Sequence, residues 1–239
     1  SGPQKVGVAM ADITTGMNAT IAILAALNHR HQTGEGQYID ISLLETQISV
    51  MANQNMNYLI GGTVPKGRGN AHPNIVPYQV FETKDGHFIL AVGNDGQFEK
   101  FANIAERPEW ATDARFNTNR ARVENRDLLV PEIEAVTIKK TTAEWLALCQ
   151  TVSVPCGPVN TIEQALNDTQ IIDRGLVQSY PHPAGVEVKQ VQTPIHYSVS
   201  KLQKTSAPPT LGQHSDDILK DMGLKSDQIA SLRQKGIIN

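Results

Sequence analysis

Asp12 is the residue of this sequence best placed for covalent chemistry. It lies between a short apolar stretch broken by Gly7 and a long apolar helical pattern that begins at Ile13. A carboxylate in the first turn of a helix is close to the positive end of the helix dipole and to unpaired N–H groups, so it stays ionised and can act as a nucleophile. A carboxylate that only caps the helix occupies the same position. The local pattern leaves both roles open.

A second candidate is the loop of residues 63–77, which carries three prolines, two glycines and no apolar periodicity. Gly67 and Gly69 allow the close backbone approach and the hinge motion that a loop closing over a substrate requires. An ordinary surface turn has the same composition. His72 in this loop could donate a hydrogen bond to a substrate carboxylate, or it could only cap the loop.

The other reactive side chains favour structural roles. Cys149 and Cys156 lie seven positions apart, a spacing typical of neither a disulfide framework nor a metal site, so we expect reduced thiols and no metal. Cys156 has no base beside it in the sequence, which argues against a catalytic thiol. Asp95 and His214 each precede a predicted helix, where capping or packing is the simpler role.

Bulk composition excludes several classes of function. The 239 residues carry 21 basic and 24 acidic side chains, a net charge of −3, and no clustered basic stripe, so nucleic acid is not an expected partner. We find no glycine-rich phosphate cradle. No uninterrupted apolar run approaches the ~20 residues that cross a bilayer, and no secretory signal precedes the first helix. These features predict a soluble cytoplasmic protein that does not use a membrane.

The first part of the chain predicts one edge of an α/β domain. Residues 13–31 are apolar on most faces, which is typical of a helix buried inside a larger domain. Residues 37–42 alternate polar and apolar side chains and predict a short strand. Apolar residues recur at helical intervals over residues 44–60 and predict a second helix.

The pattern changes after the loop. Two apolar segments flank Asp85 and Gly86, which predicts a hairpin with a type I′ turn. Helices are expected over residues 97–105, 120–136 and 142–150, the last with a capping region at Thr141 or Thr142 and Glu144. A second hairpin around residues 186–191 and two short helices from Ser215 and Ser226 complete the chain. The predicted segments are a large-domain portion at residues 1–62, a linker or functional loop at 63–77, a small α+β domain at 78–181, and a return linker with C-terminal helices at 182–239.

Several motifs together carry a resemblance to a known family. The sequence resembles the family III CoA-transferases, which include formyl-CoA and carnitine CoA-transferases and have acyl-CoA racemases as relatives. The resemblance extends over the whole chain, and its motifs are specific as a set although each is weak alone. They are Gly2 to Gly16 with its Ala-Asp-x-x-Thr-Gly stretch, Ile23 to Leu27, Arg30 to Glu45, Gly67 to Pro73, Val154 to Val159, and Leu211 to Asp216.

The resemblance implies a fold and an assembly. It implies the C-terminal part of a family III CoA-transferase fold, namely an edge of a Rossmann-like large domain and a smaller α+β domain, with the C-terminal tail returning to the large domain. It also implies a homodimer whose two subunits interlock as linked rings. Because family members carry a long Rossmann-like portion ahead of the Asp stretch, we expect this chain to be truncated. That portion would supply most contacts to the nucleotide of CoA.

The resemblance also implies a reaction. Asp12 aligns with the catalytic carboxylate of the family, which attacks an acyl-CoA thioester and becomes an aspartyl-CoA thioester that a second carboxylic acid then resolves. Acyl-CoA is thus a substrate, and no permanently bound cofactor is expected. We expect N–H groups near Ile13 and Thr14 to stabilise the oxyanion. Gly69, Asn70 and His72 are the expected substrate-binding residues, and their departure from the most glycine-rich members favours dicarboxylates such as succinate or glutarate.

Two other functions stay open. In an acyl-CoA racemase the same Asp12 acts as an acid or base at the α-carbon and needs a partner base from elsewhere. Alternatively, the chain is an inactive fragment that acts only through protein–protein contacts.

Overall fold

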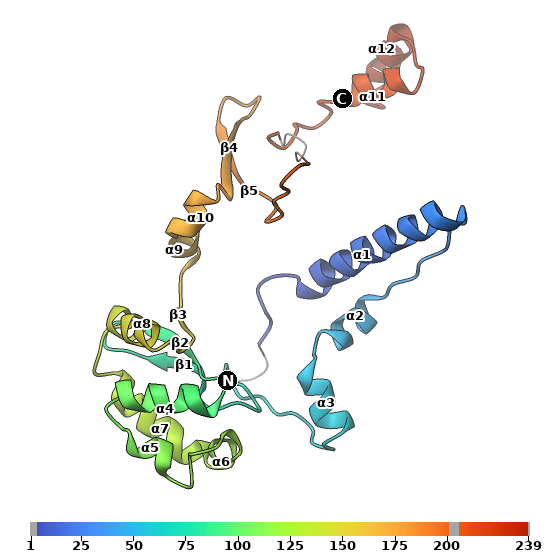
Figure 1. The fold of residues 1–239 in the computed structure, drawn as a ribbon. Helices are drawn as coiled ribbons and strands as arrows, with labels where there is room; N and C mark the ends of the chain where they lie inside the picture. Colours follow the sequence, from blue (N-terminus) through green and yellow to red (C-terminus); the bar gives the residue numbers. More distant parts are fainter. Residues whose placement is uncertain (1–3, 201–205, 239) are drawn as a thin grey trace. The chain divides into compact units, whose positions relative to one another are not determined.

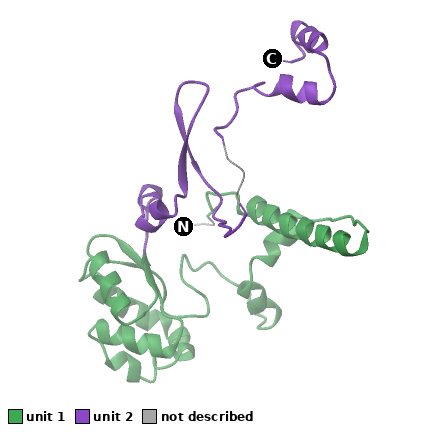
Figure 2. Ribbon diagram, turned by 45° about the horizontal axis from the view of Figure 1, so that its top comes forward, with its two compact units in different colours: residues 1–157 green, residues 158–239 purple. Residues whose placement is uncertain are grey.

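The computed structural model describes residues 4–200 and 206–238, so the start of the first motif, Gly2 and Pro3, lies outside the described residues. The chain divides into two compact units, Ser1–Gly157 and Pro158–Asn239 (Figure 2). All the residues predicted to do chemistry belong to the first unit.

Three helices occupy the first 60 residues. The predicted first helix is confirmed as α1 (Met10–Thr33), which begins three residues earlier than expected and ends at Gly34 in the left-handed conformation (Figure 1). The predicted strand at residues 37–42 is wrong, because this segment has no regular secondary structure and pairs with no strand among the described residues. The predicted helix at 44–60 is two helices, α2 (Leu43–Ser49) and α3 (Asn53–Leu59). The break falls at Ala52, whose positive φ of 45° cannot occur inside a helix.

The long helix α1 has no buried residue, whereas the sequence predicted burial on most faces. Met17, Ile21 and Leu24 are each more than 60% exposed. By length and mean hydropathy, 1.4 over its most apolar window, α1 is long and apolar enough to cross a membrane, although interior helices of soluble proteins pass the same test. Counting only uninterrupted apolar runs missed this property, because threonines and asparagines are interspersed along the helix.

A three-stranded sheet follows the loop, in the order β1-β2-β3. The predicted hairpin is confirmed: β1 (Tyr78–Glu82) pairs antiparallel with β2 (His87–Ala91), and β3 (Cys156–Pro158) joins the sheet beside β2. The type I′ turn is wrong, because that turn needs positive φ at both central residues and none of residues 83–86 has it. Asp85 instead accepts hydrogen bonds from Thr142 N–H at 2.8 Å and from the Thr83 hydroxyl at 3.2 Å. The turn therefore holds the hairpin against the start of the last helix of this unit.

Helices and the sheet enclose one aromatic core. Trp145 stacks on Phe88 with ring centroids 6.0 Å apart, and its indole N–H donates to the Thr137 carbonyl at 2.8 Å. Trp110 and Phe101 are also fully buried. The predicted capping box at Thr141 and Glu144 is confirmed. The helices around this core are α4 (Asp95–Ile104), α5 (Glu109–Thr112), α6 (Asn119–Glu124), α7 (Arg126–Thr137) and α8 (Thr142–Thr151).

Two details of these helices differ from the sequence prediction. The helix expected over residues 120–136 is interrupted at Asn125, which separates α6 from α7. Asp95 is not the cap of α4, because the Asn94 side chain accepts the Gln97 N–H at 2.9 Å. Asp95 instead forms an ion pair at 2.8 Å with Arg122, whose side chain is completely buried.

The second unit consists of small elements. Its hairpin, predicted around residues 186–191, is confirmed as β4 paired with β5, and the two predicted C-terminal helices are also present. Arg233 and Asp216 form an ion pair at 2.7 Å between these helices. His214 precedes the first of them as predicted, but its side chain makes no cap hydrogen bond. The elements are α9 (Ile162–Leu166), α10 (Thr169–Asp173), β4 (Val177–Pro181), β5 (Glu187–Val191), α11 (Ser215–Asp221) and α12 (Ser226–Gln234).

Candidate functional site

Asp12 lies in the first turn of α1, at the third helical position. Its side chain is exposed, and its carboxylate makes no hydrogen bond or ion pair with any residue from 4 to 200 or from 206 to 238. It is not the cap, because Ala9 precedes the helix and no side chain caps it. A carboxylate that is exposed and uncommitted can approach an electrophile without first breaking an internal contact.

The backbone around Asp12 corrects one prediction. Ile13 and Thr14 were expected to offer free N–H groups, but the Ile13 N–H donates to the Ala9 carbonyl at 3.1 Å, and Thr14 lies one residue deeper in the helix. The N–H groups of Ala11 and Asp12 itself have no acceptor in the described part of the chain. These two groups, at the positive end of the helix dipole, are the donors that an oxyanion could use.

His72 is half-buried and held on three sides. Its backbone N–H donates to the Tyr78 carbonyl at 2.9 Å, its ring stacks on Tyr78 with centroids 5.2 Å apart, and its Nδ1 accepts the Asn74 N–H at 3.1 Å. Burial and then the charge of Arg126 lower the pKa of His72 from its ordinary 6.5. The imidazole is therefore neutral near pH 7, and because Nδ1 accepts a hydrogen bond, its proton is on Nε2, which can donate.

The other two predicted substrate residues have different settings. Gly69 adopts a positive φ of 61°, a conformation that favours glycine, and no atom lies within 4 Å of the position a Cβ would take. Asn70 uses its side-chain oxygen to accept the Val80 N–H at 2.7 Å, which ties the loop to β1. The structure thus gives Asn70 an anchoring contact, and the substrate role of all three residues stays a prediction.

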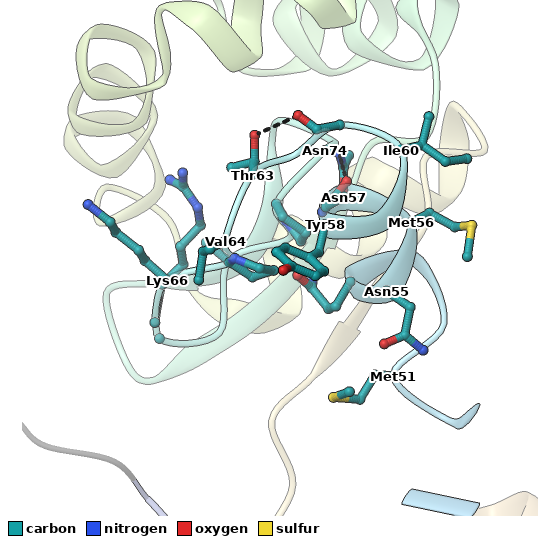
Figure 3. A pocket seen from close by; sticks show the side chains of 18 residues that line it. Met51, Asn55, Met56, Asn57, Tyr58, Ile60, Thr63, Val64, Lys66 and Asn74 are labelled. Carbon is teal, nitrogen blue, oxygen red and sulfur yellow. Dashed lines mark hydrogen bonds between the residues drawn. The ribbon is translucent and has the colours of Figure 1, made fainter. Parts of the chain in front are cut away.

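An open pocket of about 1370 Å³ lies between α3 and the loop that contains Gly69 (Figure 3). Figure 3 shows Asn57, Tyr58 and Met56 of α3 around it, together with Thr63, Val64 and Lys66 of the loop. Arg68 and Gly69 also line it, whereas Asp12, Asn70 and His72 do not. The structure therefore does not bring the predicted site residues together in one cavity.

Asn74 holds the loop against helices on two sides. Its side chain exchanges two hydrogen bonds with the side chain of Asn57, at 3.0 and 3.2 Å, and accepts a third from Asn53 at 3.3 Å. Its carbonyl accepts from the Asn119 side chain at 2.9 Å. These contacts fix one wall of the pocket relative to the other.

Arg126 fixes the same loop from α7. Its guanidinium donates to the His72 carbonyl at 2.7 Å and to the Pro73 carbonyl at 3.1 Å. Sequence reasoning missed Arg126 and Asn74, because these contacts join positions 17 to 54 residues apart and no local pattern marks them.

The two cysteines are free, as predicted, and are unsuited to nucleophilic chemistry. Burial raises the pKa of Cys149 to about 12, and burial also raises the pKa of the half-buried Cys156. Both thiols are therefore protonated at neutral pH. No group of three or more His, Cys, Asp or Glu side chains suited to a metal ion occurs within residues 4–200 and 206–238.

Comparison with known sequences identifies relatives over the whole chain. The family model described as CoA-transferase family III matches residues 1–215. The succinate–glutarate CoA-transferase of Agrobacterium fabrum is 46% identical over 220 residues, which are 92% of this chain and 55% of that protein. The mouse succinyl-CoA:glutarate CoA-transferase is 38% identical over 238 residues, which are 99% of this chain and 54% of that protein. The chain spans about half the length of the curated relatives it matches.

Two solved structures also resemble this chain in fold. A CAIB/BAIF family protein from Brucella suis is 44% identical and superimposes with a TM-score of 0.73, over 92% of this chain and 57% of that one. Rv3272 from Mycobacterium tuberculosis is 25% identical with a TM-score of 0.76, over 90% of this chain and 57% of that one. The mixed α/β fold predicted from the sequence is confirmed by both.

Proposed function

This chain belongs to CoA-transferase family III, and we propose that in the intact enzyme it transfers coenzyme A between carboxylic acids through a thioester on Asp12. The observation that carries the proposal is the setting of Asp12. Its carboxylate is exposed, has no partner among the described residues, and lies beside the free N–H groups of Ala11 and Asp12 at the start of α1.

The reaction proceeds by acyl exchange at this carboxylate. An oxygen of Asp12 attacks the thioester carbonyl of the donor acyl-CoA, the C–S bond breaks, and CoA thiolate leaves behind a mixed anhydride. The thiolate then attacks the Asp12 carbonyl carbon, which releases the donor acid as a carboxylate and leaves aspartyl-CoA. The acceptor carboxylate repeats the two steps in reverse, which regenerates the Asp12 carboxylate and forms the new acyl-CoA.

Each tetrahedral intermediate places a negative charge on one carbonyl oxygen. The N–H groups of Ala11 and Asp12 are fixed by the helix and need no reorganisation to donate to that oxygen, which is how preorganised donors lower a barrier. The hydroxyls of Thr14 and Thr15 donate back to the carbonyls of Met10 and Ala11, at 2.7 and 2.6 Å, so these side chains are bonded within the helix.

We propose dicarboxylic acids such as succinate and glutarate as the acids exchanged. The support is twofold: two relatives are named for succinate and glutarate, and the loop at Gly67–His72 carries charged and polar residues in place of a glycine run. Acyl-CoA enters as a substrate, with no permanently bound cofactor.

We also propose a cytoplasmic homodimer with interlocked subunits. The exposed apolar side chains of α1, among them Met17 and Leu24, both 61% exposed, support this assembly, because an exposed apolar helix face is typical of a surface that a partner covers. In this proposal α1 is an interior helix of the assembled enzyme and not a membrane span.

The test is mass spectrometry of the intact enzyme after incubation with succinyl-CoA and without an acceptor acid. We expect a hydroxylamine-sensitive CoA adduct on the peptide that contains Asp12, and no adduct in Asp12→Asn. Asp227→Asn is the matched control, because Asp227 is also an acid in the first turn of a helix. An adduct or appreciable turnover in Asp12→Asn would refute the assignment.

Solvent deuterium separates transfer from racemisation. A racemase incorporates deuterium at the α-carbon of an acyl-CoA without any acceptor acid, whereas the proposed transferase needs the acceptor and leaves the α-carbon unlabelled. Deuterium incorporation that Asp12→Asn abolishes would favour the racemase.

A further inference from the structure

The pocket between α3 and the loop is positively charged. Lys66 and Arg68 line it, and none of its lining residues is an Asp or a Glu. Neither cation forms an ion pair with an acidic side chain in the described part of the chain. The rest of the polar lining is uncharged, and it includes Asn55, Asn57 and Tyr58.

A third cation reinforces this charge from behind the loop. Arg126 binds two loop carbonyls and no carboxylate. Burial, and then the charge of Arg68, lower the pKa of Arg126, so the two guanidinium groups repel one another across the loop. The charge of Asp127 offsets this only in part, because it is the smallest of the three effects. An anion bound near Arg68 would relieve the repulsion.

We propose that this pocket binds an anionic oxygen group of a substrate, with Arg68 as its principal ligand and Lys66 as a second counter-charge. The proposal rests on the proposed function and extends it to the residues that select a substrate. Two substrate groups share the required chemistry: the second carboxylate of a dicarboxylic acid and a phosphate of CoA. Arg68 can bind either in a bidentate manner, while Lys66 acts as a point charge.

The walls of the pocket suit such a group. The mutual hydrogen bonds of Asn57 and Asn74 hold the end of the loop against α3, so this part of the wall is in place before a ligand binds. Side-chain amides and the Tyr58 hydroxyl can supply further donors without adding charge. The absence of lining acids means that no internal carboxylate competes with the ligand.

The test compares Arg68→Gln with the wild type in steady-state assays of the intact enzyme. If the ligand is the second carboxylate, KM for glutarate rises by about tenfold to a hundredfold, as expected for loss of a charged hydrogen bond, while KM for the monocarboxylate pentanoate is unchanged. If the ligand is a CoA phosphate, KM for succinyl-CoA rises instead, and the variant no longer distinguishes succinyl-CoA from its 3′-dephospho form. Arg120→Gln is the matched control, because Arg120 is exposed and already paired with Glu124.

A readout without turnover separates this proposal from the proposed function. Calorimetric titration of Asp12→Asn with glutarate and with inorganic phosphate measures anion binding when no thioester can form. Binding in that background that Arg68→Gln removes supports the pocket even if wild type forms no aspartyl adduct. Unchanged KM values together with unchanged anion binding in Arg68→Gln would overturn the proposal.

Discussion

Replacing Arg122 with methionine should destabilise the core of the first unit more than any exposed ion-pair mutation. The Arg122 side chain is fully buried and donates to the Val76 carbonyl at 2.6 Å, to the Phe116 carbonyl at 2.9 Å and to Asp95 at 2.8 Å. Its guanidinium also lies 4.3 Å from the Phe98 ring centroid. A methionine side chain can fill much of the same space but can donate none of these bonds.

The magnitude follows from the acceptors left behind. Val76 and Phe116 are buried, and a buried carbonyl that loses its donor costs about 1–3 kcal/mol, so the two together cost about 2–6 kcal/mol. Asp95 adds little, because it is 53% exposed and water can replace its partner. We therefore expect a loss of about 4 kcal/mol in the free energy of unfolding.

Urea unfolding followed by tryptophan fluorescence measures this loss, since Trp110 and Trp145 both lie in the same core. Asp95→Asn is the matched control and should cost less than about 1 kcal/mol, because it leaves both backbone carbonyls satisfied. A loss below about 1 kcal/mol for Arg122→Met, or equal losses for the two variants, would refute the reasoning. Val76 is the next-to-last residue of the 63–77 loop, so the same variant should also disturb this loop and weaken substrate binding.

Two further predictions follow from shifted pKa values. Because the pKa of His72 is lowered by burial and by Arg126, the unfolded chain binds its proton more tightly. The contribution of neutral His72 to stability is therefore complete above its ordinary pKa of 6.5 and is lost as the pH falls through the lowered pKa of the folded state. The urea midpoint of His72→Gln should consequently depend less on pH between about 7.5 and 5 than that of the wild type. Cys149, with a pKa of about 12, should resist iodoacetamide at pH 8 until urea unfolds the core, and fast labelling of the folded protein would contradict its burial.

Local sequence signals predicted the elements whose stabilising contacts are local. The helix α8 was found because Thr141 and Glu144 form a reciprocal cap within four residues. The strand at residues 37–42 failed for the opposite reason, because alternation indicates only that a segment could pair, and a strand needs a partner elsewhere in the chain. The break between α2 and α3 depends on the φ of Ala52, which no side-chain pattern encodes.

The same distinction applies to the candidate site. Asp12 and the loop were predicted because each lies in a short motif whose chemistry is evident from residue types. The asparagine contacts of Asn74 and the backbone contacts of Arg126 were not, since they join segments that are distant in the sequence. Sequence reasoning thus selected Asp12 as the candidate catalytic carboxylate, a role that stays a prediction, but it did not find the framework that shapes the pocket.

The sequence predicted that α1 is buried, whereas the structure leaves it exposed, and this difference has a physical explanation. The apolar pattern of a helix indicates which of its faces are buried when it is packed against a partner. The pattern of α1 is typical of an interior helix, although no residue of α1 is buried within this chain. Exposing Met17, Ile21 and Leu24 to water is unfavourable by about 25 cal/mol per Å² of apolar surface, so the sequence encodes a contact that the isolated chain does not make. Asp12 lies at the start of this helix. In the proposed homodimer the same contact therefore sets the environment of the carboxylate, and the mass-spectrometric test of the proposed adduct belongs on the assembled protein.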